Sequence, residues 1–92
     1  MMYATKIRMK PGCHYSQSLL EIDSIYIEGC TESGLYKKAT VHDYVKANPG
    51  SIKVNVYPYP DVIHATSDRG EKFVRSSPNG YTHDNLLSLP RI

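Results

Sequence analysis

Residues 40–57, TVHDYVKANPGSIKVNVY, decide the fold class, because their apolar residues change from a helical spacing to a strand spacing. Thr40 is the expected N-cap of a helix, with Asp43 as the acidic partner of a capping box. Asn48-Pro49-Gly50 ends this helix, since the residue before proline avoids the α region and glycine permits a left-handed turn. The apolar face of the predicted helix is formed by Val41, Tyr44, Val45 and Ala47.

The second half of the same stretch has the two-residue period of a half-buried strand. The side chains expected to point inward are Ile52, Val54 and Val56, and those expected to point outward are Lys53, Asn55 and Tyr57. The run Tyr57-Pro58-Tyr59-Pro60 follows, and we expect it to be extended, at a sheet edge or in a linker, because proline donates no ladder hydrogen bond.

Two more strands are predicted upstream of the helix. The alternation over residues 3–10 predicts one face formed by Tyr3, Thr5, Ile7 and Met9 and an opposite face formed by Lys6, Arg8 and Lys10. Residues 19–27 form the second strand, and their alternation slips at Asp23-Ser24, where we expect a bulge. Residues 29–34, GCTESG, have the composition of a polar loop.

Downstream, residues 61–66 and 71–76 are predicted to form a hairpin through Ser67-Asp68-Arg69-Gly70. Ser77-Pro78-Asn79-Gly80 has the composition of a turn. Asp84 is expected to cap one helical turn whose leucines dock on the sheet. The order β-β-α-β-β-β predicts an α+β domain with a small, mainly antiparallel sheet of about five strands and one helix.

Composition sets the broad class. The 92 residues are 40% apolar and 22% charged with a net charge of +2, so we expect one small globular domain over residues 1–92. No apolar run approaches the roughly 20 residues that span a bilayer, and residues 1–6 lack the apolar region of a secretory signal. Two cysteines, Cys13 and Cys30, are fewer than a secreted scaffold needs. We therefore expect a cytoplasmic protein with unpaired thiols and no membrane partner.

The last third of the chain resembles a known family, the small bacterial and archaeal proteins called domain of unknown function 3892. The resemblance rests on Phe73-Val74-Arg75-Ser76, Pro78-Asn79-Gly80, Thr82 and the tail Asp84-Asn85-Leu86-Leu87-Ser88-Leu89-Pro90. It is looser upstream, where Asn48-Pro49-Gly50 stands in place of the family's frequent Gly-Gly pair. The resemblance implies no activity, cofactor or partner. The motif residues interpreted as structural are Arg75, Asp84, Asn85, Leu86, Leu87, Leu89 and Pro90, the alternative being that the tail docks a partner.

Chemical motifs are sparse. The residues that suggest a metal site are Cys13, Cys30, His14, His42, His64 and His83, but they lack the ligand spacing of structural zinc sites. His42 falls in the first turn of the predicted helix and is expected to face solvent. No phosphate-binding loop, zinc-protease motif or nucleophile elbow occurs. We therefore expect no metal, no cofactor and no enzymatic activity, because a chain of this size has little room for a deep active site.

Two binding hypotheses remain. The first is a binding module for a protein partner or for a second copy of the chain, because eight tyrosines suit an interface and a small sheet leaves edges open. The second is binding of single-stranded nucleic acid through a basic sheet face formed by Lys6, Arg8, Lys10, Lys53 and Tyr57. The basic residues are equally consistent with an ordinary solvated sheet face.

Overall fold

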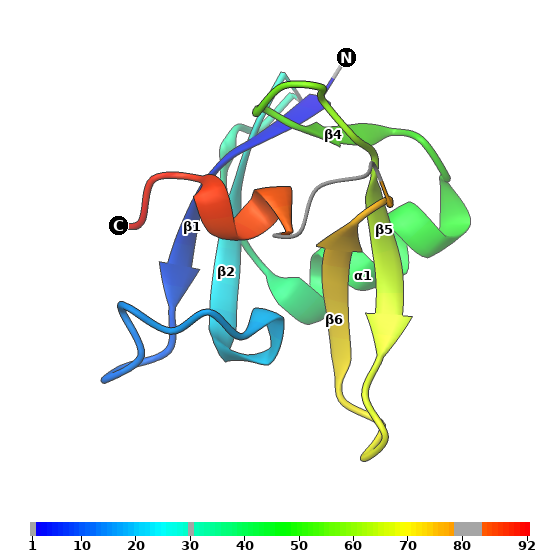
Figure 1. The fold of residues 1–92 in the computed structure, drawn as a ribbon. Coiled ribbons are helices and arrows are strands. Elements are labelled where there is room, and N and C mark those ends of the chain that lie inside the picture. The colour runs from blue at the N-terminus through cyan, green and yellow to red at the C-terminus, as the bar shows by residue number, and fades with distance from the viewer. Residues whose placement is uncertain (1, 30, 79–83) are drawn as a thin grey trace.

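The computed structural model describes residues 2–29, 31–78 and 84–92. Within these ranges the chain forms six strands, one α-helix and two short 3-10 turns, and it is an α+β fold as predicted (Figure 1). In chain order the elements are β1 (Met2–Met9), η1 (Leu19–Glu21), β2 (Ile22–Glu28), β3 (Gly34–Lys37), α1 (Lys38–Ala47), β4 (Ile52–Val54), β5 (Val62–Thr66), β6 (Lys72–Ser76) and η2 (Asn85–Ser88). No helix of the described residues has the length and apolar character needed to cross a bilayer.

The strands form two sheets rather than one. Four strands follow the order β3-β2-β1-β4, with β4 parallel to β1 and the other pairs antiparallel. The hairpin β5-β6 is a separate antiparallel pair, joined to β4 by the isolated bridge between Lys53 and Asp61. The connecting turn is the predicted one: the Ser67 amide donates to the Glu71 carbonyl oxygen at 2.9 Å, and Gly70 has a φ of +82°.

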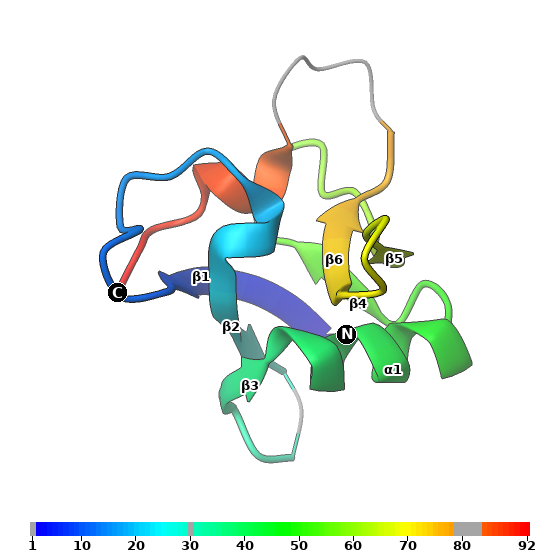
Figure 2. The same cartoon turned by 90° about the horizontal axis from the view of Figure 1, so that it is seen from below.

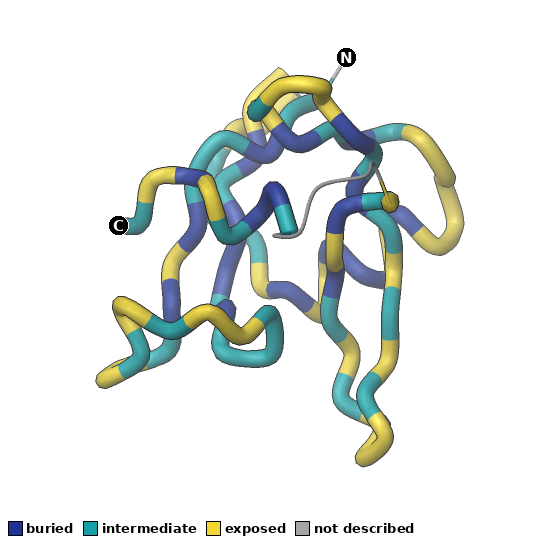
Figure 3. Tube along the Cα trace, in the orientation of Figure 1, coloured by how far each residue is buried: buried dark blue, intermediate teal, exposed yellow. Residues whose placement is uncertain are grey.

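The core lies between the four-stranded sheet and the hairpin. Figure 2 shows α1 on one side of this space and η2 on the opposite side, so that four layers of structure enclose it. The residues that fill it are dark blue in Figure 3, and those with the least exposure include Ile7, Ile25, Val45, Val62, Val74 and Leu86. Every element except β3 and η1 contributes at least one buried apolar side chain.

Bulges on both strands of the β1–β2 pair set which residues reach the core. Ala4 pairs with Ile27 but Lys6 pairs with Tyr26, so Thr5 is an extra residue on β1. The alternation therefore shifts: Ala4 is fully buried, whereas Tyr3 and Thr5 are only partly buried, which corrects the predicted inner face. The second bulge places Asp23 as the extra residue on β2, where the sequence predicted it.

Other boundaries differ from the prediction. Residues 19–21 form η1 instead of the start of a strand. Residues 34–37 form β3, although the sequence predicted a loop ending at Gly34 and no element directly after it. The helix begins at Lys38, with Lys37 as its N-cap, so neither Thr40 nor Asp43 caps it. Its end is as predicted, since Asn48 is the C-cap and Gly50 has a φ of +77°.

The buried face of α1 is also different from the predicted one. Its buried residues are Lys38, Val41, His42 and Val45, whereas Tyr44 and Ala47 are exposed. His42 is only 3% exposed, which contradicts the expected solvent-facing position. The reason is that the hairpin packs against α1 from outside the four-stranded sheet, and this second packing surface has no signal in the helix sequence.

The run Tyr57-Pro58-Tyr59-Pro60 is a tight turn rather than an extended segment. The Tyr59 amide donates to the Val56 carbonyl oxygen at 2.7 Å, and Tyr59 has a φ of +60°. Pro60 then runs beside β4, where its carbonyl oxygen accepts from the Val54 amide at 2.8 Å. Of the predicted Ser77-Pro78-Asn79-Gly80 turn, residues 79 and 80 lie outside the described residues.

Candidate functional site

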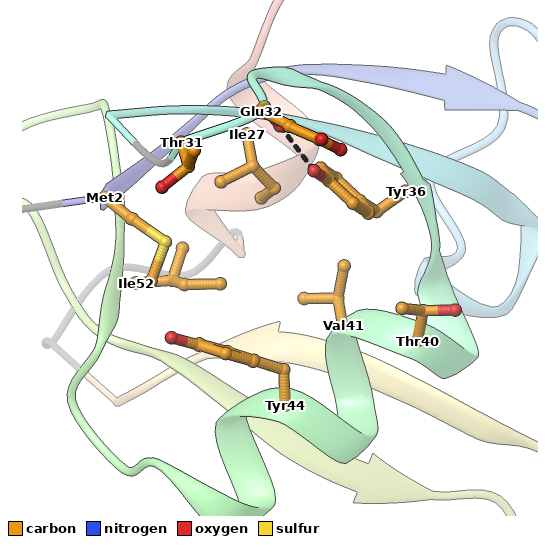
Figure 4. A pocket seen from close by; sticks show the side chains of 9 residues that line it. All are labelled: Met2, Ile27, Thr31, Glu32, Tyr36, Thr40, Val41, Tyr44 and Ile52. Atoms are coloured by element: carbon orange, nitrogen blue, oxygen red, sulfur yellow. Dashed lines mark hydrogen bonds between the residues drawn. The ribbon is translucent and has the colours of Figure 1, made fainter.

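A pocket of about 390 Å³ opens between α1 and the adjoining edge of the four-stranded sheet (Figure 4). It is lined from β1, β2, the loop before β3, β3 itself, α1 and β4 by Met2, Ile27, Thr31, Glu32, Tyr36, Thr40, Val41, Tyr44 and Ile52. Its volume falls within the range of about 300–1,000 Å³ that ligand pockets usually have. It is therefore large enough for one bulky side chain or a small ligand.

The floor of the pocket is apolar and rigidly held. Ile27, Val41 and Ile52 are each 3% exposed and belong to the hydrophobic core. The bulge at Thr5 and the parallel pairing of β4 with β1 bring Ile27 and Ile52 to the same end of the sheet. Because these side chains are fixed by packing on their far side, the floor is formed before any ligand arrives.

Two tyrosines form the walls. Tyr36 lies on β3 and Tyr44 on α1, and Figure 4 shows their side chains on opposite sides of Val41. The Tyr36 hydroxyl donates to the backbone carbonyl oxygen of Glu32, which ties β3 to the preceding loop. Tyr44 is 43% exposed at the rim. The walls thus combine aromatic surface with polar tips, which is the composition of binding hot spots.

The ionisable groups with shifted pKa values lie elsewhere. The thiol of Cys13 donates to Glu21 Oε2 at 3.2 Å, and this hydrogen bond raises the pKa of Cys13. Hydrogen bonds from Lys38 and then Lys10 lower the pKa of Glu71. Cys13 and Glu71 lie near η1 and the hairpin turn. The pKa of Asp23 is lowered by hydrogen bonds from Ser24 and Lys37, and that of Asp43 by hydrogen bonds from Lys72 and His42. None of these groups lines the pocket.

The structure separates the residues of the predicted basic face. Lys6 and Arg8 share the outer face of β1, with the Lys6 ammonium 4.9 Å from the centre of the Tyr26 ring. Lys10 lies beyond the end of β1 and pairs with Glu71 at 3.3 Å. Lys53 is next to Tyr3 at the other end of β1.

The other residues of the predicted basic face, Lys53 and Tyr57, also lie apart from Lys6 and Arg8. Lys53 forms an ion pair with Asp61, and Tyr57 is 74% exposed in the turn after β4. The five residues therefore do not form one continuous surface, and only Lys6 and Arg8 stand together.

The tail motif is built into the core, as predicted. Asp84 is the N-cap of η2 and its carboxylate accepts from the Leu86 amide at 2.9 Å and from the Ser76 amide at 3.0 Å. Leu86 is fully buried, Leu89 is 4% exposed and Leu87 is partly buried. Asn85 is buried, and its side-chain amide donates to the Tyr57 carbonyl oxygen at 3.4 Å.

The end of the chain fastens this motif to β1. The Ile7 amide donates to the Pro90 carbonyl oxygen at 2.9 Å, and the Ile92 amide donates to the Ile7 carbonyl oxygen at 2.9 Å. The tail thereby continues the edge of β1 that β4 occupies further along. Arg75, the remaining motif residue, is exposed on β6. The leucine packing and the backbone pairing favour a structural role for the tail, whereas no contact among the described residues explains Arg75.

The candidate metal ligands are dispersed. His14 is exposed in the loop after β1, beside the partly buried Cys13, and His64 is exposed on β5 next to buried His42. Cys30 and His83 lie outside the described residues. Among the described residues, no group of three or more histidines, cysteines and carboxylates has the geometry of a metal site.

The sequence did not predict the pocket. Its lining comes from six segments, and their meeting depends on β3 and on the parallel pairing of β4, neither of which was predicted. The available signal was the high tyrosine content, which pointed to an interface without locating it.

One known protein family matches most of the chain. A family model described as "Protein of unknown function (DUF3892)" matches residues 5–90. Searches of curated proteins and of solved structures returned no match. The matched range includes β1 from Thr5 onward, the tail motif and all of the pocket except Met2.

Proposed function

Because the chain belongs to DUF3892, a family of unknown function, its own geometry must supply a functional hypothesis, and we propose that it is a non-enzymatic binding module. Its binding site is the pocket between α1 and the sheet, and its ligand is an apolar, preferably aromatic, side chain of a protein partner. A cytoplasmic location is part of this proposal, supported by the small number of cysteines.

The observation that carries the proposal is the combination of an apolar floor with two aromatic walls, Tyr36 partly buried and Tyr44 exposed. Ile27, Val41 and Ile52 are buried, yet they line an open pocket of about 390 Å³. Tyr44 contributes a large, 43% exposed ring at its rim. An aromatic side chain placed there gains contact with the Tyr36 and Tyr44 rings and removes apolar surface from water.

A protein side chain fits better than a metabolite because of the surroundings of the pocket. Thr31, Glu32 and Thr40 at the rim are exposed, so a ligand in the pocket remains accessible for connection to a larger molecule. Beside the pocket, β3 is the outer strand of the four-stranded sheet, and such a strand offers backbone groups to a partner.

The distribution of ionisable groups supports the non-enzymatic part of the proposal. Catalytic sites gather acids, bases or nucleophiles with shifted pKa values in one cleft. Here Lys10, Cys13 and Glu71 have shifted pKa values but lie near η1, and Asp23 and Asp43 are each paired with a lysine. None of these five groups lines the pocket. The thiol of Cys13 has a raised pKa, which disfavours the nucleophilic thiolate.

N-Acetyltryptophanamide is a suitable probe, because the chain contains no tryptophan and the probe's indole fluorescence is therefore the only such signal. Titrating protein into the probe should give a saturable blue shift of the indole emission, with a Kd of about 1 mM, the scale of a single side chain. The Tyr44→Ala variant should bind at least about fivefold more weakly, since it loses a ring contact worth about 1 kcal/mol.

Tyr15→Ala is the matched control, because Tyr15 is 87% exposed in the loop after β1 and lies outside the pocket. Its Kd should equal that of the unaltered protein. An absence of saturable binding, or equal losses in both variants, would contradict the proposal.

The alternative function is binding of single-stranded nucleic acid at the outer face of β1. It is favoured by one observation: the Lys6 ammonium lies over the Tyr26 ring, and the exposed Arg8 is on the same face of β1. At about 50 mM salt a Lys6→Glu, Arg8→Glu variant should lose affinity for a fluorescent oligonucleotide, whereas Lys46→Glu on α1 should retain more of it. Unaltered protein with no affinity at that salt concentration would exclude this alternative.

A further inference from the structure

His42 is a buried histidine that takes no part in the pocket. It projects from α1 toward the β5–β6 hairpin and is 3% exposed. Its Nδ1 atom lies 2.9 Å from Asp43 Oδ1, whereas its Nε2 atom is buried with no hydrogen-bond partner among the described residues. A buried polar atom without a partner costs free energy, so an arrangement that leaves one in place calls for a ligand or another explanation.

The contact with Asp43 fixes the proton on the imidazole. Lys72 donates to Asp43 Oδ1 at 2.9 Å and forms an ion pair with this carboxylate. An ionised carboxylate only accepts hydrogen bonds, so Nδ1 of His42 must be the donor. In the neutral ring the lone pair then resides on Nε2. A histidine whose Nδ1–H is held by a carboxylate while Nε2 keeps its lone pair is the usual form of a metal ligand.

A second imidazole lies beside the first. The His64 ring, on β5, has its centre 5.4 Å from the centre of the His42 ring, and the two planes are inclined at 82°. With metal–nitrogen bonds of about 2.0–2.1 Å, two imidazoles at the tetrahedral angle have ring centres about 5 Å apart. The observed spacing therefore suits two ligands of one ion, and the exposure of His64 leaves solvent access to the remaining coordination positions.

The cations packed near this pair are already neutralised. Lys38, one helical turn before His42 on the same buried face, donates to Glu71 and to the Leu20 carbonyl oxygen. Lys72, on β6, is paired with Asp43. The charges facing the histidines from α1 and β6 thus form ion pairs, and the local charge does not oppose a cation as strongly as the lysines alone would.

We propose that His42 and His64 form a two-histidine site for a divalent transition-metal ion of the zinc and copper group, with water completing its coordination. Imidazole nitrogen is a preferred ligand for these ions. Such a site joins α1 to the hairpin at the one buried ring nitrogen of the described histidines that has no hydrogen bond. It is separate from the pocket and does not depend on the binding function proposed above.

Zinc titration by isothermal calorimetry, in chelator-free buffer at pH 7.5, tests the site. The unaltered protein should bind one Zn²⁺ per chain, and His64→Ala should weaken binding at least tenfold because it removes a ligand. Asp43→Asn should weaken it about 10-fold to 100-fold, as substitutions of the group that orients a ligating histidine generally do. His64 is exposed, so its replacement does not open the core.

His14 serves as the control, because it is exposed in the loop after β1 and separates this site from general surface binding. His14→Ala should change the zinc affinity by less than about twofold. Zinc should also shift the ring resonances of His42 and His64 in NMR spectra while leaving those of His14 in place. Unaltered protein that fails to saturate below about 1 mM Zn²⁺, or an His64→Ala variant with unchanged affinity, would overturn the proposal.

Discussion

Leu86 and Leu87 are neighbours in the sequence with different roles in the fold. Leu86 is fully buried beneath the sheet, whereas Leu87 only borders the core. The sequence predicted both as core residues, because apolar character alone does not distinguish the two sides of a short 3-10 turn. The geometry of η2, begun by the Asp84 cap, determines which leucine faces inward.

Leu86→Ala should therefore lower the free energy of unfolding by about 2–4 kcal/mol, the cost of lost burial plus a cavity. Leu87→Ala should cost only about 1 kcal/mol, because less apolar surface is returned to water. Urea unfolding followed by circular dichroism measures both. Equal losses in the two variants would contradict the packing described for η2.

Glu71 connects three segments through charge. Lys38 on α1 and Lys10 after β1 both donate to its carboxylate, and their hydrogen bonds lower its pKa from the ordinary value of 4.5. A group whose pKa is lower in the folded state stabilises the fold above its unfolded pKa. That contribution is lost as the pH falls through the folded pKa.

The Glu71→Gln variant should accordingly be less stable than the unaltered protein at pH 7, and the difference should shrink as the pH falls below 4.5. Urea midpoints at a series of pH values from 7 to about 3 measure this convergence. In a Lys38→Met background the effect of Glu71→Gln at pH 7 should be smaller, because the main partner is gone. If the difference in stability between Glu71→Gln and the unaltered protein did not change with pH, the ion pairs of Glu71 would not be its cause.

At the scale of elements, η2 depends on one carboxylate. Asp84 accepts from the Leu86 amide at 2.9 Å within η2 and from the Ser76 amide at 3.0 Å on β6, so it joins the turn to the hairpin. Asp84→Ala should cost about 1–2 kcal/mol, at the upper end for a helix cap because two amides lose their acceptor. Asp84→Asn, which keeps an acceptor oxygen, should cost less.

Amide hydrogen exchange gives a local check on the same change. The Leu86 and Ser76 amides should be accelerated in Asp84→Ala by a larger factor than the Ile25 amide in the middle of β2, which reports only the global loss of stability. Uniform acceleration across the chain would instead indicate global destabilisation without a local role for the cap.

The elements predicted well from the sequence were those with local signals. The β5–β6 hairpin has a turn ending in Gly70, the end of α1 has Pro49 and Gly50, and η2 has its Asp84 cap. The start of α1 was missed because Lys38 is a buried polar residue whose hydrogen-bond partners, Leu20 and Glu71, are 18 and 33 residues away. No helical pattern contains that information.

The errors in the strands have a similar cause. The extra residue Thr5 in β1 moves the core position to Ala4, and a bulge is set by the partner strand rather than by local alternation. The candidate site was the least predictable part of the structure. The pocket forms only where six segments meet, and His42 is buried because the hairpin packs on α1. The sequence identified the tyrosines and histidines as candidate residues but did not predict which residues surround them in the fold.

At the scale of the whole molecule, the four-stranded sheet ends at β3 on one side, whereas β4 on the other side is bridged to Asp61. An outer strand can pair with another chain, and with the tyrosine content it supports the expectation of self-association. Sedimentation analysis across about 10–100 μM should show a concentration-dependent shift from monomer toward dimer. A single monomeric species over that range would leave β3 available only to other partners.

The central claim is that the pocket between α1 and the sheet binds an aromatic side chain. The most direct measurement is of intermolecular nuclear Overhauser effects between N-acetyltryptophanamide and the protein's methyl groups. The indole protons should show contacts with the methyl groups of Ile27, Val41 and Ile52, which form the floor of the pocket. Indole contacts confined to methyl groups outside the pocket, or none at saturating probe, would contradict the account.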